Sequence, residues 1–221
     1  MSAAAIIVAA GLGKRFSPDI PKQFVKLNGI PVFLWSVFAF KKSKIFSQII
    51  VVVPKNYLLQ LGPYANKYDI ELIAGGKERF DSVKSGLRKL KKNIEYVAIH
   101  DGARPLIKIK EIIECFNAAK RYGAAIVAVP AKDTVKKVNA SSFIEKTIPR
   151  NSVRLAQTPQ IFKKTLIQKV YSRKISPKTT DDAQLIEIVG GKVKIVNGDY
   201  NNLKITEPRD LKIAELLLKS E

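Results

Sequence analysis

Several reactive residue types are almost absent from this sequence of 221 residues. It contains one cysteine, Cys115, and one histidine, His100. A single cysteine excludes an internal disulfide and a cysteine-based zinc site, and a single histidine excludes a histidine-based metal cluster. Cys115 lies in a helical pattern and is predicted to be a buried, inert thiol. His100 stands beside Asp101 and is predicted to be a structural residue at the end of a strand.

Long apolar runs and acidic residues are also scarce. No run reaches the roughly 18 residues of a membrane span and no secretory leader is recognisable, so we expect a cytoplasmic protein with no membrane partner. Asp and Glu number 19 against 39 Lys and Arg, which gives a net charge of +20 and an attraction for anions. The lysines are scattered, without a basic tail or a basic recognition helix, so nucleic acid is not predicted as a partner.

Apolar runs of strand length recur along the chain and alternate with helical patterns. The runs lie at 4–9, 48–53, 70–73, 95–99, 124–129 and 193–197, and helices are predicted at 31–40, 80–90, 108–122, 163–171 and 208–218. This alternation is typical of an α/β fold with a Rossmann-like, mainly parallel sheet and helices on both faces. With 46% hydrophobic residues and no linker-like stretch, residues 1–221 are expected to form a single domain.

Residues 133–154 break this alternation. They contain two short β-rich stretches around a polar turn at 139–142, which predict a protruding β-hairpin arm. The arm has too few apolar residues to be stable alone. These residues are equally consistent with packing on a second subunit and with folding back on their own domain.

The most informative motif follows the first strand. Ala9-Ala10-Gly11-Leu12-Gly13-Lys14-Arg15, with Pro21-Lys22-Gln23 shortly after, places glycines and cations where an open α/β sheet releases the chain. Glycines allow backbone N–H groups to approach phosphate oxygens, so the loop is predicted to bind a polyphosphate. The alternative, from this stretch alone, is an ordinary strand-to-helix turn with solvated basic residues.

Two familiar phosphate motifs do not fit this loop. A P-loop needs Ser or Thr after Gly13-Lys14, but Arg15 stands there. A dinucleotide fingerprint needs a small residue where Phe16 stands and a carboxylate after the second strand, which ends instead in Pro54-Lys55. The polyphosphate is therefore expected to be bound in another way.

Residues that follow the predicted strands share a chemistry of cations, amides and small side chains. They are Gly75-Gly76 to Ser82, His100 to Arg104, Asp133-Thr134 and Asn201 to Lys204. Asp101 is the best-placed carboxylate, and few acids or bases accompany it. This set favours phosphoryl or nucleotidyl transfer over hydrolysis, because a phosphate nucleophile is already ionised and needs no general base. Arg, Lys and Mg²⁺ would offset the charges of the substrates.

Seven blocks of sequence, in order and at matching spacing, resemble one family across essentially the whole chain. They are the loop with Pro21-Lys22-Gln23, Gly75-Gly76-Lys77-Glu78-Arg79-Phe80-Asp81-Ser82-Val83, His100-Asp101-Gly102-Ala103-Arg104-Pro105, Asp133-Thr134-Val135-Lys136, Gln157-Thr158-Pro159-Gln160, Thr180-Asp181-Asp182-Ala183 and Asn202-Leu203-Lys204-Ile205-Thr206. Together they resemble the 2-C-methyl-D-erythritol 4-phosphate cytidylyltransferases, the nucleotidyltransferases of the non-mevalonate isoprenoid pathway.

The resemblance implies a reaction and a set of site residues. The phosphate oxygen of methylerythritol phosphate would attack the α-phosphorus of CTP, with Mg²⁺ required, giving CDP-methylerythritol and pyrophosphate. Arg15 and Lys22 would neutralise the triphosphate in the transition state, beside the loop glycines Gly11 and Gly13. The cytosine would be held by Ala9, Ala10, Gly76 and Ser82. Asp101, Gly102 and Ala103 would lie near the ribose, the metal and the second substrate, with Asp101 as the metal ligand.

The resemblance also implies a shared site in a homodimer. Lys204 and Arg150 would position the sugar phosphate, with Thr134 assisting. In this family the arm belongs to a neighbouring subunit, so Thr134 and Arg150 would act in the partner's site. The catalytic unit would then be the dimer.

Two departures from the family pattern and three competing functions accompany this interpretation. Asn201 stands where the family usually has Asp near the metal, and Val153-Arg154 replaces a usual aromatic. Ribitol 5-phosphate cytidylyltransferase shares the fold and most motifs. Gly102-Ala103 before Arg104 and the Thr180 to Ala183 block favour the methylerythritol branch, although Asn201 weakens that distinction. A sugar-nucleotide transferase that uses another base and a basic nucleic-acid-binding domain are the remaining two candidates.

Overall fold

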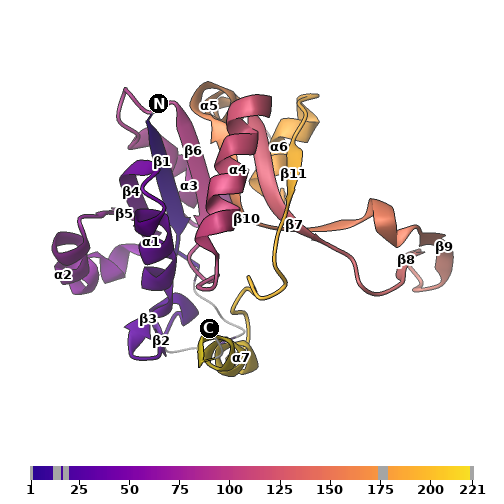
Figure 1. Ribbon diagram of the computed structural model, residues 1–221, viewed down its shortest axis with the longest axis horizontal. Helices are drawn as coiled ribbons and strands as arrows, with labels where there is room; N and C mark the ends of the chain where they lie inside the picture. Colours follow the sequence, from indigo (N-terminus) through magenta and orange to yellow (C-terminus); the bar gives the residue numbers. More distant parts are fainter. Residues whose placement is uncertain (1, 12–15, 17–19, 174–178, 220–221) are drawn as a thin grey trace.

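A seven-stranded sheet forms the centre of the computed structural model, which describes residues 2–11, 16, 20–173 and 179–219 (Figure 1). The strand order is β11-β7-β10-β6-β1-β4-β5. These strands are β1 (Ala3–Val8), β4 (Phe46–Val53), β5 (Glu71–Ala74), β6 (Tyr96–Asp101), β7 (Ala124–Pro130), β10 (Arg154–Lys163) and β11 (Lys194–Asn197). A short antiparallel pair, β2 (Lys26–Leu27) and β3 (Ile30–Pro31), precedes the first helix.

The sheet is mainly parallel, as predicted, with one exception. β10 pairs antiparallel with both β6 and β7, whereas the other neighbours in this sheet are parallel. The sequence did not predict β10. The chain leaves the sheet at the carboxyl end of β7, makes the hairpin and returns to the sheet at that same end. The returning strand, β10, therefore has to run antiparallel to β7.

Helices cover both faces of the sheet, which confirms the predicted layers. They are α1 (Val32–Lys42), α2 (Leu58–Tyr68), α3 (Arg79–Arg88), α4 (Ile109–Tyr122), α5 (Lys164–Ser172), α6 (Asp182–Ile188) and α7 (Pro208–Lys219). α1, α2 and α4 pack on one face, with Ala3, Ala5 and Ile7 of β1. α3, α5 and α6 pack on the other, with Ala4 and Ile6. The alternation along β1 is the period of two expected for a strand buried on both faces. α2 and α6 were not predicted.

The C-terminal helix lies outside these two layers. Ala214 of α7 is buried with Leu27, Val32 and Ile205 in a small third cluster. Figure 1 shows α7 below the carboxyl ends of the strands, near β2 and β3. This packing carries the segment after β11 across the end of the sheet, so that its polar residues reach the end of β6.

The predicted hairpin is present. β8 (Val135–Val138) and β9 (Ile144–Ile148) form an antiparallel pair that projects far from the sheet in Figure 1. The Asn139 side-chain oxygen accepts hydrogen bonds from the N–H groups of Ser141 and Phe143, both at 3.0 Å, and closes the turn. Phe143 is 72% exposed and Ile144 63% exposed, so the arm presents apolar surface to solvent.

No helix in the described part of the chain is long and apolar enough to cross a membrane.

Helix α3 approaches β1 closely at a glycine. A Cβ built on Gly86 would lie 2.7 Å from Cγ2 of Ile6. We expect Gly86→Ala to lower the free energy of unfolding by about 1–3 kcal/mol, because overpacking outweighs the better helix propensity of alanine. Urea unfolding measures this change. Ser85→Ala, one residue earlier in the same helix, is the matched control and should change stability by no more than about 0.5 kcal/mol. Equal effects of the two substitutions would contradict the packing argument.

Candidate active site

A cavity of about 350 Å³ opens at the carboxyl ends of β1 and β6. Strand β1 has parallel neighbours on both sides, β4 reached through α1 and β6 reached later through α3 on the opposite face. The chain therefore reverses its direction of progress across the sheet at this point, which is where open α/β sheets form their binding crevice. The cavity is lined by Val8, Ala9, Ala10, Gly11, Lys22, Gln23, Gly76, Lys77, Glu78, Arg79, Ser82, Asp101, Ala103, Lys204 and Thr206.

The backbone after β1 is held in place by a buried glutamine. The Gln23 side chain donates to the carbonyl oxygens of Ala9 and Gly11, both at 2.6 Å. Gln23 is 2% exposed and directly follows Lys22, which lines the cavity. One side chain thus ties the strand end to the short helical turn at Lys22–Phe24, where Lys22 lines the cavity.

Small residues form another wall of the cavity. A Cβ on Gly75 would lie 2.4 Å from the Cβ of Ala10, so only glycine allows the segment after β5 to approach the segment after β1 this closely. The Gly76 N–H donates to the Ser82 hydroxyl at 3.2 Å, and that hydroxyl donates to the Glu78 carbonyl at 3.1 Å. These bonds fix the turn that leads into α3 and leave a narrow pocket of backbone groups.

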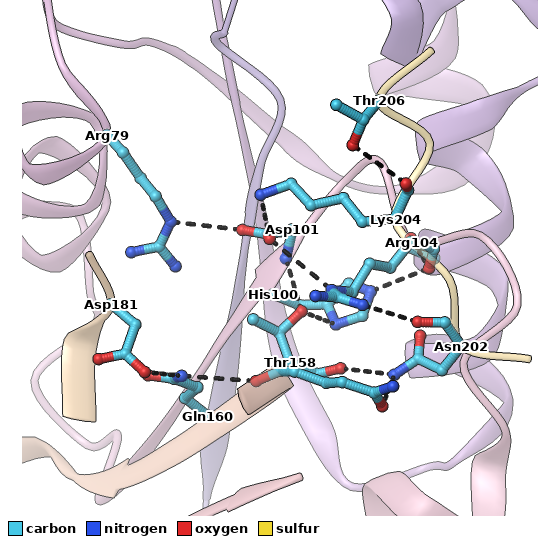
Figure 2. A network of polar contacts seen from close by, with 12 residues as sticks. Arg79, His100, Asp101, Arg104, Thr158, Gln160, Asp181, Asn202, Lys204 and Thr206 are labelled. Atoms are coloured by element: carbon cyan, nitrogen blue, oxygen red, sulfur yellow. Dashed lines mark hydrogen bonds and ion pairs between the residues drawn. The ribbon is translucent and has the colours of Figure 1, made fainter. Parts of the chain in front are cut away.

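Asp101, the last residue of β6, is surrounded by cations (Figure 2). Its carboxylate lies 2.8 Å from Lys204 Nζ, 3.3 Å from Arg79 Nε and 3.8 Å from Arg104 Nε. Burial alone would raise the pKa of Asp101, but the charges of Arg79, Lys204 and Arg104 outweigh burial and hold the pKa well below its usual range. Asp101 is therefore a carboxylate at any physiological pH and cannot serve as a general acid.

His100 is a structural residue, as predicted. It is fully buried, with Nε2 3.2 Å from the Arg104 carbonyl and Nδ1 3.0 Å from the Thr158 hydroxyl. The carbonyl requires the proton on Nε2, so Nδ1 accepts from Thr158, whose oxygen in turn accepts the Asp101 N–H at 3.0 Å. Burial lowers the pKa of His100 to about 4, and the ring is neutral at physiological pH.

The segment after β11 is anchored to the same network (Figure 2). Buried Asn202 donates through Nδ2 to the Gln157 side chain and to the Thr158 carbonyl, both at 3.0 Å. Arg104 Nη1 donates to the Asn202 carbonyl at 2.7 Å, and the Ile205 N–H donates to the Ala103 carbonyl at 2.8 Å. Lys204 lies between these anchors and reaches Asp101. Residues far apart in sequence are thus brought together at the end of β6.

Most of the predicted site residues meet in this cavity. Its lining includes Ala9, Ala10, Gly11, Lys22, Gly76, Ser82, Asp101, Ala103 and Lys204. Gly102 lies between Asp101 and Ala103, where a Cβ would be 3.1 Å from the Cβ of Ala9. Gly13 and Arg15 lie outside the described residues. Thr134 and Arg150 belong to the arm and do not line the cavity, and Arg150 Nη1 instead donates to the Lys132 carbonyl at 3.1 Å.

Arg79 and Asp182 are among the charged residues of the site that were not singled out from the sequence. Arg79, the first residue of α3, lines the cavity and pairs with Asp101. Its Nη2 atom also lies 2.7 Å from Oδ2 of Asp182, a carboxylate with no solvent exposure. Both residues belong to the blocks that carry the family resemblance, and that was the available signal. Their pairing across 103 positions could not be read from local patterns.

The donor set fits a magnesium ion that arrives with a phosphate ligand. In the described part of the chain no three or more His, Cys, Asp or Glu residues form a group that could hold a metal. Mg²⁺ usually keeps several waters and is bound by one or two carboxylates together with substrate phosphates. Asp101, kept ionised in the cavity, meets that requirement with a nucleotide present.

Comparisons with known proteins identify the family of this chain. The family model of 2-C-methyl-D-erythritol 4-phosphate cytidylyltransferase (IspD) matches residues 3–220. A relative of that name from Endomicrobium trichonymphae is 48% identical over 220 residues, with 100% of both chains covered. A second, from Syntrophus aciditrophicus, is 40% identical and covers 98% of this chain and 96% of its own. The crystal structure of 4-diphosphocytidyl-2C-methyl-D-erythritol synthase from Anaerococcus prevotii matches with a TM-score of 0.87 and 32% identity, covering 99% of this chain and 98% of that one.

The fold and the site define a nucleotidyltransferase of the Rossmann-like α/β class. The chain belongs to the 2-C-methyl-D-erythritol 4-phosphate cytidylyltransferase family. Membership confirms the predicted resemblance and supports cytidylyl transfer from CTP to methylerythritol phosphate in isoprenoid biosynthesis. It does not favour the ribitol phosphate alternative.

The burial of His100 predicts how the free energy of unfolding depends on pH. The folded pKa of about 4 lies below the ordinary value of 6.5, so the unfolded chain takes up a proton first as the pH falls. The contribution of His100 is fully present above pH 6.5 and is lost between about 6.5 and 4. We expect a loss of about 3 kcal/mol across this window, which urea unfolding at several pH values measures.

The control for this prediction is His100→Gln, which keeps a polar side chain but cannot titrate. Because the chain has only 1 histidine, no other imidazole titrates in this window. The variant should be less stable at neutral pH, and its stability should fall by about 3 kcal/mol less than that of the wild type between pH 6.5 and 4. Parallel pH profiles of the two proteins would show that His100 is not the group responsible.

Proposed function

We propose that cytidylyl transfer takes place in the cavity between β1 and β6, with CTP lying across the carboxyl ends of both strands. The observation that carries this proposal is the arrangement of charge within one cavity. Lys22, Arg79 and Lys204 line it, and the last two pair with the carboxylate of Asp101. Uncharged small residues and backbone groups at Ala10, Gly76 and Ser82 also line it. A nucleotide has the same division, with a charged triphosphate joined to a neutral base.

The reaction needs no proton acceptor from the protein. A phosphate oxygen of methylerythritol phosphate attacks the α-phosphorus of CTP, a new P–O bond forms, and the bond to pyrophosphate breaks. That oxygen is already ionised near neutral pH. The site agrees with this, because its histidine is buried in a structural network and its central carboxylate is held by cations. Catalysis then depends on positioning and on charge stabilisation.

Cations carry the stabilisation of charge in this proposal. Arg15 and Lys22 neutralise the triphosphate as negative charge builds up in the transition state. Asp101 would hold Mg²⁺ together with the phosphates of CTP, and the metal would supply further neutralisation of the phosphate oxygens. Gln23 supports Lys22 by fixing the backbone around it. Preorganised charges of this kind are effective because they need no rearrangement during the reaction.

The base is selected by the small residues of the cavity. We assign the cytosine to the region of Ala9, Ala10, Gly76 and Ser82, and the ribose to the region of Gly102 and Ala103. The close contact of Gly75 with Ala10 and the hydrogen-bonded turn at Gly76 restrict the space for a base. A pyrimidine fits such a site better than a purine.

The second substrate requires two subunits in this proposal. Lys204 binds the phosphate of methylerythritol phosphate from within the subunit, and Arg150 and Thr134 reach the site from the arm of the partner in a homodimer. The arm supports this arrangement, because it projects from the sheet and exposes Val138, Phe143 and Ile144. An apolar surface on a thin hairpin is typical of a segment that packs on another chain.

Lys22 offers the most direct test of the proposed mechanism. We expect Lys22→Ala to lower kcat by at least about 100-fold, as removal of one transition-state donor does in other enzymes. Release of pyrophosphate from CTP in the presence of methylerythritol phosphate measures this. Lys26→Ala is the matched control, because Lys26 is exposed on β2 and does not line the cavity. Wild-type turnover of Lys22→Ala would refute the assigned role.

The shared site is tested by mixing two inactive variants. Arg150→Ala and Lys204→Ala should each impair use of methylerythritol phosphate with little effect on CTP binding. A mixed dimer regains one complete site, because intact Lys204 of one chain meets intact Arg150 of the partner subunit. After subunit exchange at equal amounts we expect roughly a quarter of wild-type activity, since about half of the dimers are mixed and each has one working site.

The control for this experiment is Lys146→Ala, an exposed residue of β9, which should keep its activity alone and in mixtures. Subunit exchange has to be verified separately, for example by mass spectrometry of differently tagged chains. Verified exchange without recovery of activity would rule out the cross-subunit assignment.

A further inference from the structure

Arg79 lies at the wall of the cavity between two carboxylates, Asp101, which Figure 2 shows paired with it, and Asp182. Its Nε atom lies 3.3 Å from Oδ1 of Asp101, and its Nη2 atom lies 2.7 Å from Oδ2 of Asp182. The Arg79 side chain is 30% exposed, whereas the Asp182 side chain has no exposure. One side of the guanidinium therefore faces the cavity and the other is held by a carboxylate that no ligand can reach.

The place of Arg79 in its helix is electrostatically unfavourable. It is the first residue of α3, where the helix dipole and the free N–H groups disfavour a cation. A buried arginine–carboxylate pair is also weak evidence for stability, because desolvation offsets most of its attraction. Helix formation and global stability therefore do not explain an arginine at position 79. A requirement for a fixed positive charge at the cavity wall explains it.

Asp182 is itself held rigidly from several elements. The Tyr171 hydroxyl of α5 donates to Oδ1 of Asp182 at 2.5 Å, and Arg79 Nη2 donates to Oδ2 at 2.7 Å. The N–H groups of Asp182 and Ala183 donate to Oε1 of Gln160 on β10 at 3.1 and 2.9 Å. The ring of Tyr171 stacks on Phe80, the residue after Arg79, with centroids 4.6 Å apart. Each Asp182 oxygen therefore has one fixed donor, and the direction of the guanidinium is set from the core.

We propose that Arg79 is a further cation of the active site, which binds a phosphate group of a substrate, and that Asp182 and Tyr171 are the positioning residues that aim it. The identity of the substrates rests on the function proposed above. Asp182 is fully buried and acts only through Arg79. The phosphate belongs either to CTP or to methylerythritol phosphate, and the two sources share the same chemistry. Lys22, Lys77 and Lys204 line the same cavity.

The first experiment uses substitutions that change the network without emptying it. Tyr171→Phe removes one hydroxyl and keeps the ring that stacks on Phe80, and Asp182→Asn removes one charge at constant size. We expect the apparent affinity for one substrate to fall about 3-fold in Tyr171→Phe and at least about 10-fold in Asp182→Asn, with a much smaller change in kcat. Calorimetry with CTP alone, and KM for each substrate, show which phosphate Arg79 binds.

Tyr64→Phe is the matched control for the hydroxyl. Tyr64 lies on α2, packs on Phe33 and does not line the cavity, so its KM values and its affinity for CTP should equal those of the wild type. Thermal unfolding of every variant separates a loss of fold from a loss of alignment. Unchanged affinity for both substrates in Tyr171→Phe and in Asp182→Asn would overturn the proposal.

The second experiment asks whether Asp182 places the guanidinium. In Arg79→Ala, added guanidinium ion, at concentrations far below those that unfold proteins, should restore part of the lost affinity by occupying the vacated site beside Asp182. The double variant Arg79→Ala/Asp182→Asn should show no rescue. Arg79→Ala/Tyr171→Phe should show weaker rescue than Arg79→Ala alone, and this second variant keeps the test valid if Asp182→Asn fails to fold. Equal rescue in all backgrounds would refute a positioning role. If the wild-type protein makes no CDP-methylerythritol, the proposed function is refuted. The affinities of the wild type and the variants for CTP, measured by calorimetry, would still test the role of Arg79.

Discussion

The ionised carboxylate of Asp101 is the interaction on which the rest of the site depends. Arg79, Arg104 and Lys204 come from the start of α3, the turn after β6 and the segment after β11, and all three approach this one group. Without the carboxylate, three positive charges within a few ångströms would repel one another in a poorly solvated place. With it, the protein can hold cations in a fixed arrangement before a polyanionic substrate arrives. The same attraction keeps Asp101 ionised.

The topology of the sheet explains how these segments meet. The chain turns away from β1 in opposite directions at β4 and β6, so the ends of β1 and β6 are adjacent and no connection covers them. The excursion through the hairpin then forces β10 to return antiparallel between β6 and β7. That return places Thr158 against His100 and Gln160 against α6. One departure from the parallel arrangement therefore supplies the arm, the support under Asp101 and the support of Asp182.

The parts of the fold that were predicted are those with a strong local pattern. β1 and β4 are apolar runs buried on both faces, α1 is apolar almost throughout and follows Pro31, and α4 has a clear apolar period. The sequence alone therefore located them within a few residues. β10 was missed because its centre contains Gln157, Thr158 and Gln160, polar side chains that are buried only because the tertiary structure supplies their partners. α2 contains Gly62 and Pro63, which argue against a helix, and α6 has only 7 residues.

The sequence by itself determined the class of fold, because strand and helix periods are local properties. It also predicted a polyphosphate-binding loop and the chemistry of the site, from the glycines after a strand and the scarcity of histidine. Only the tertiary structure decided which charges are paired. The Arg79–Asp182 contact joins the start of α3 to the start of α6, and Lys204 meets Asp101 across half the chain. An ion pair depends on distances of a few ångströms, and those distances exist only after the sheet has set the order of its strands.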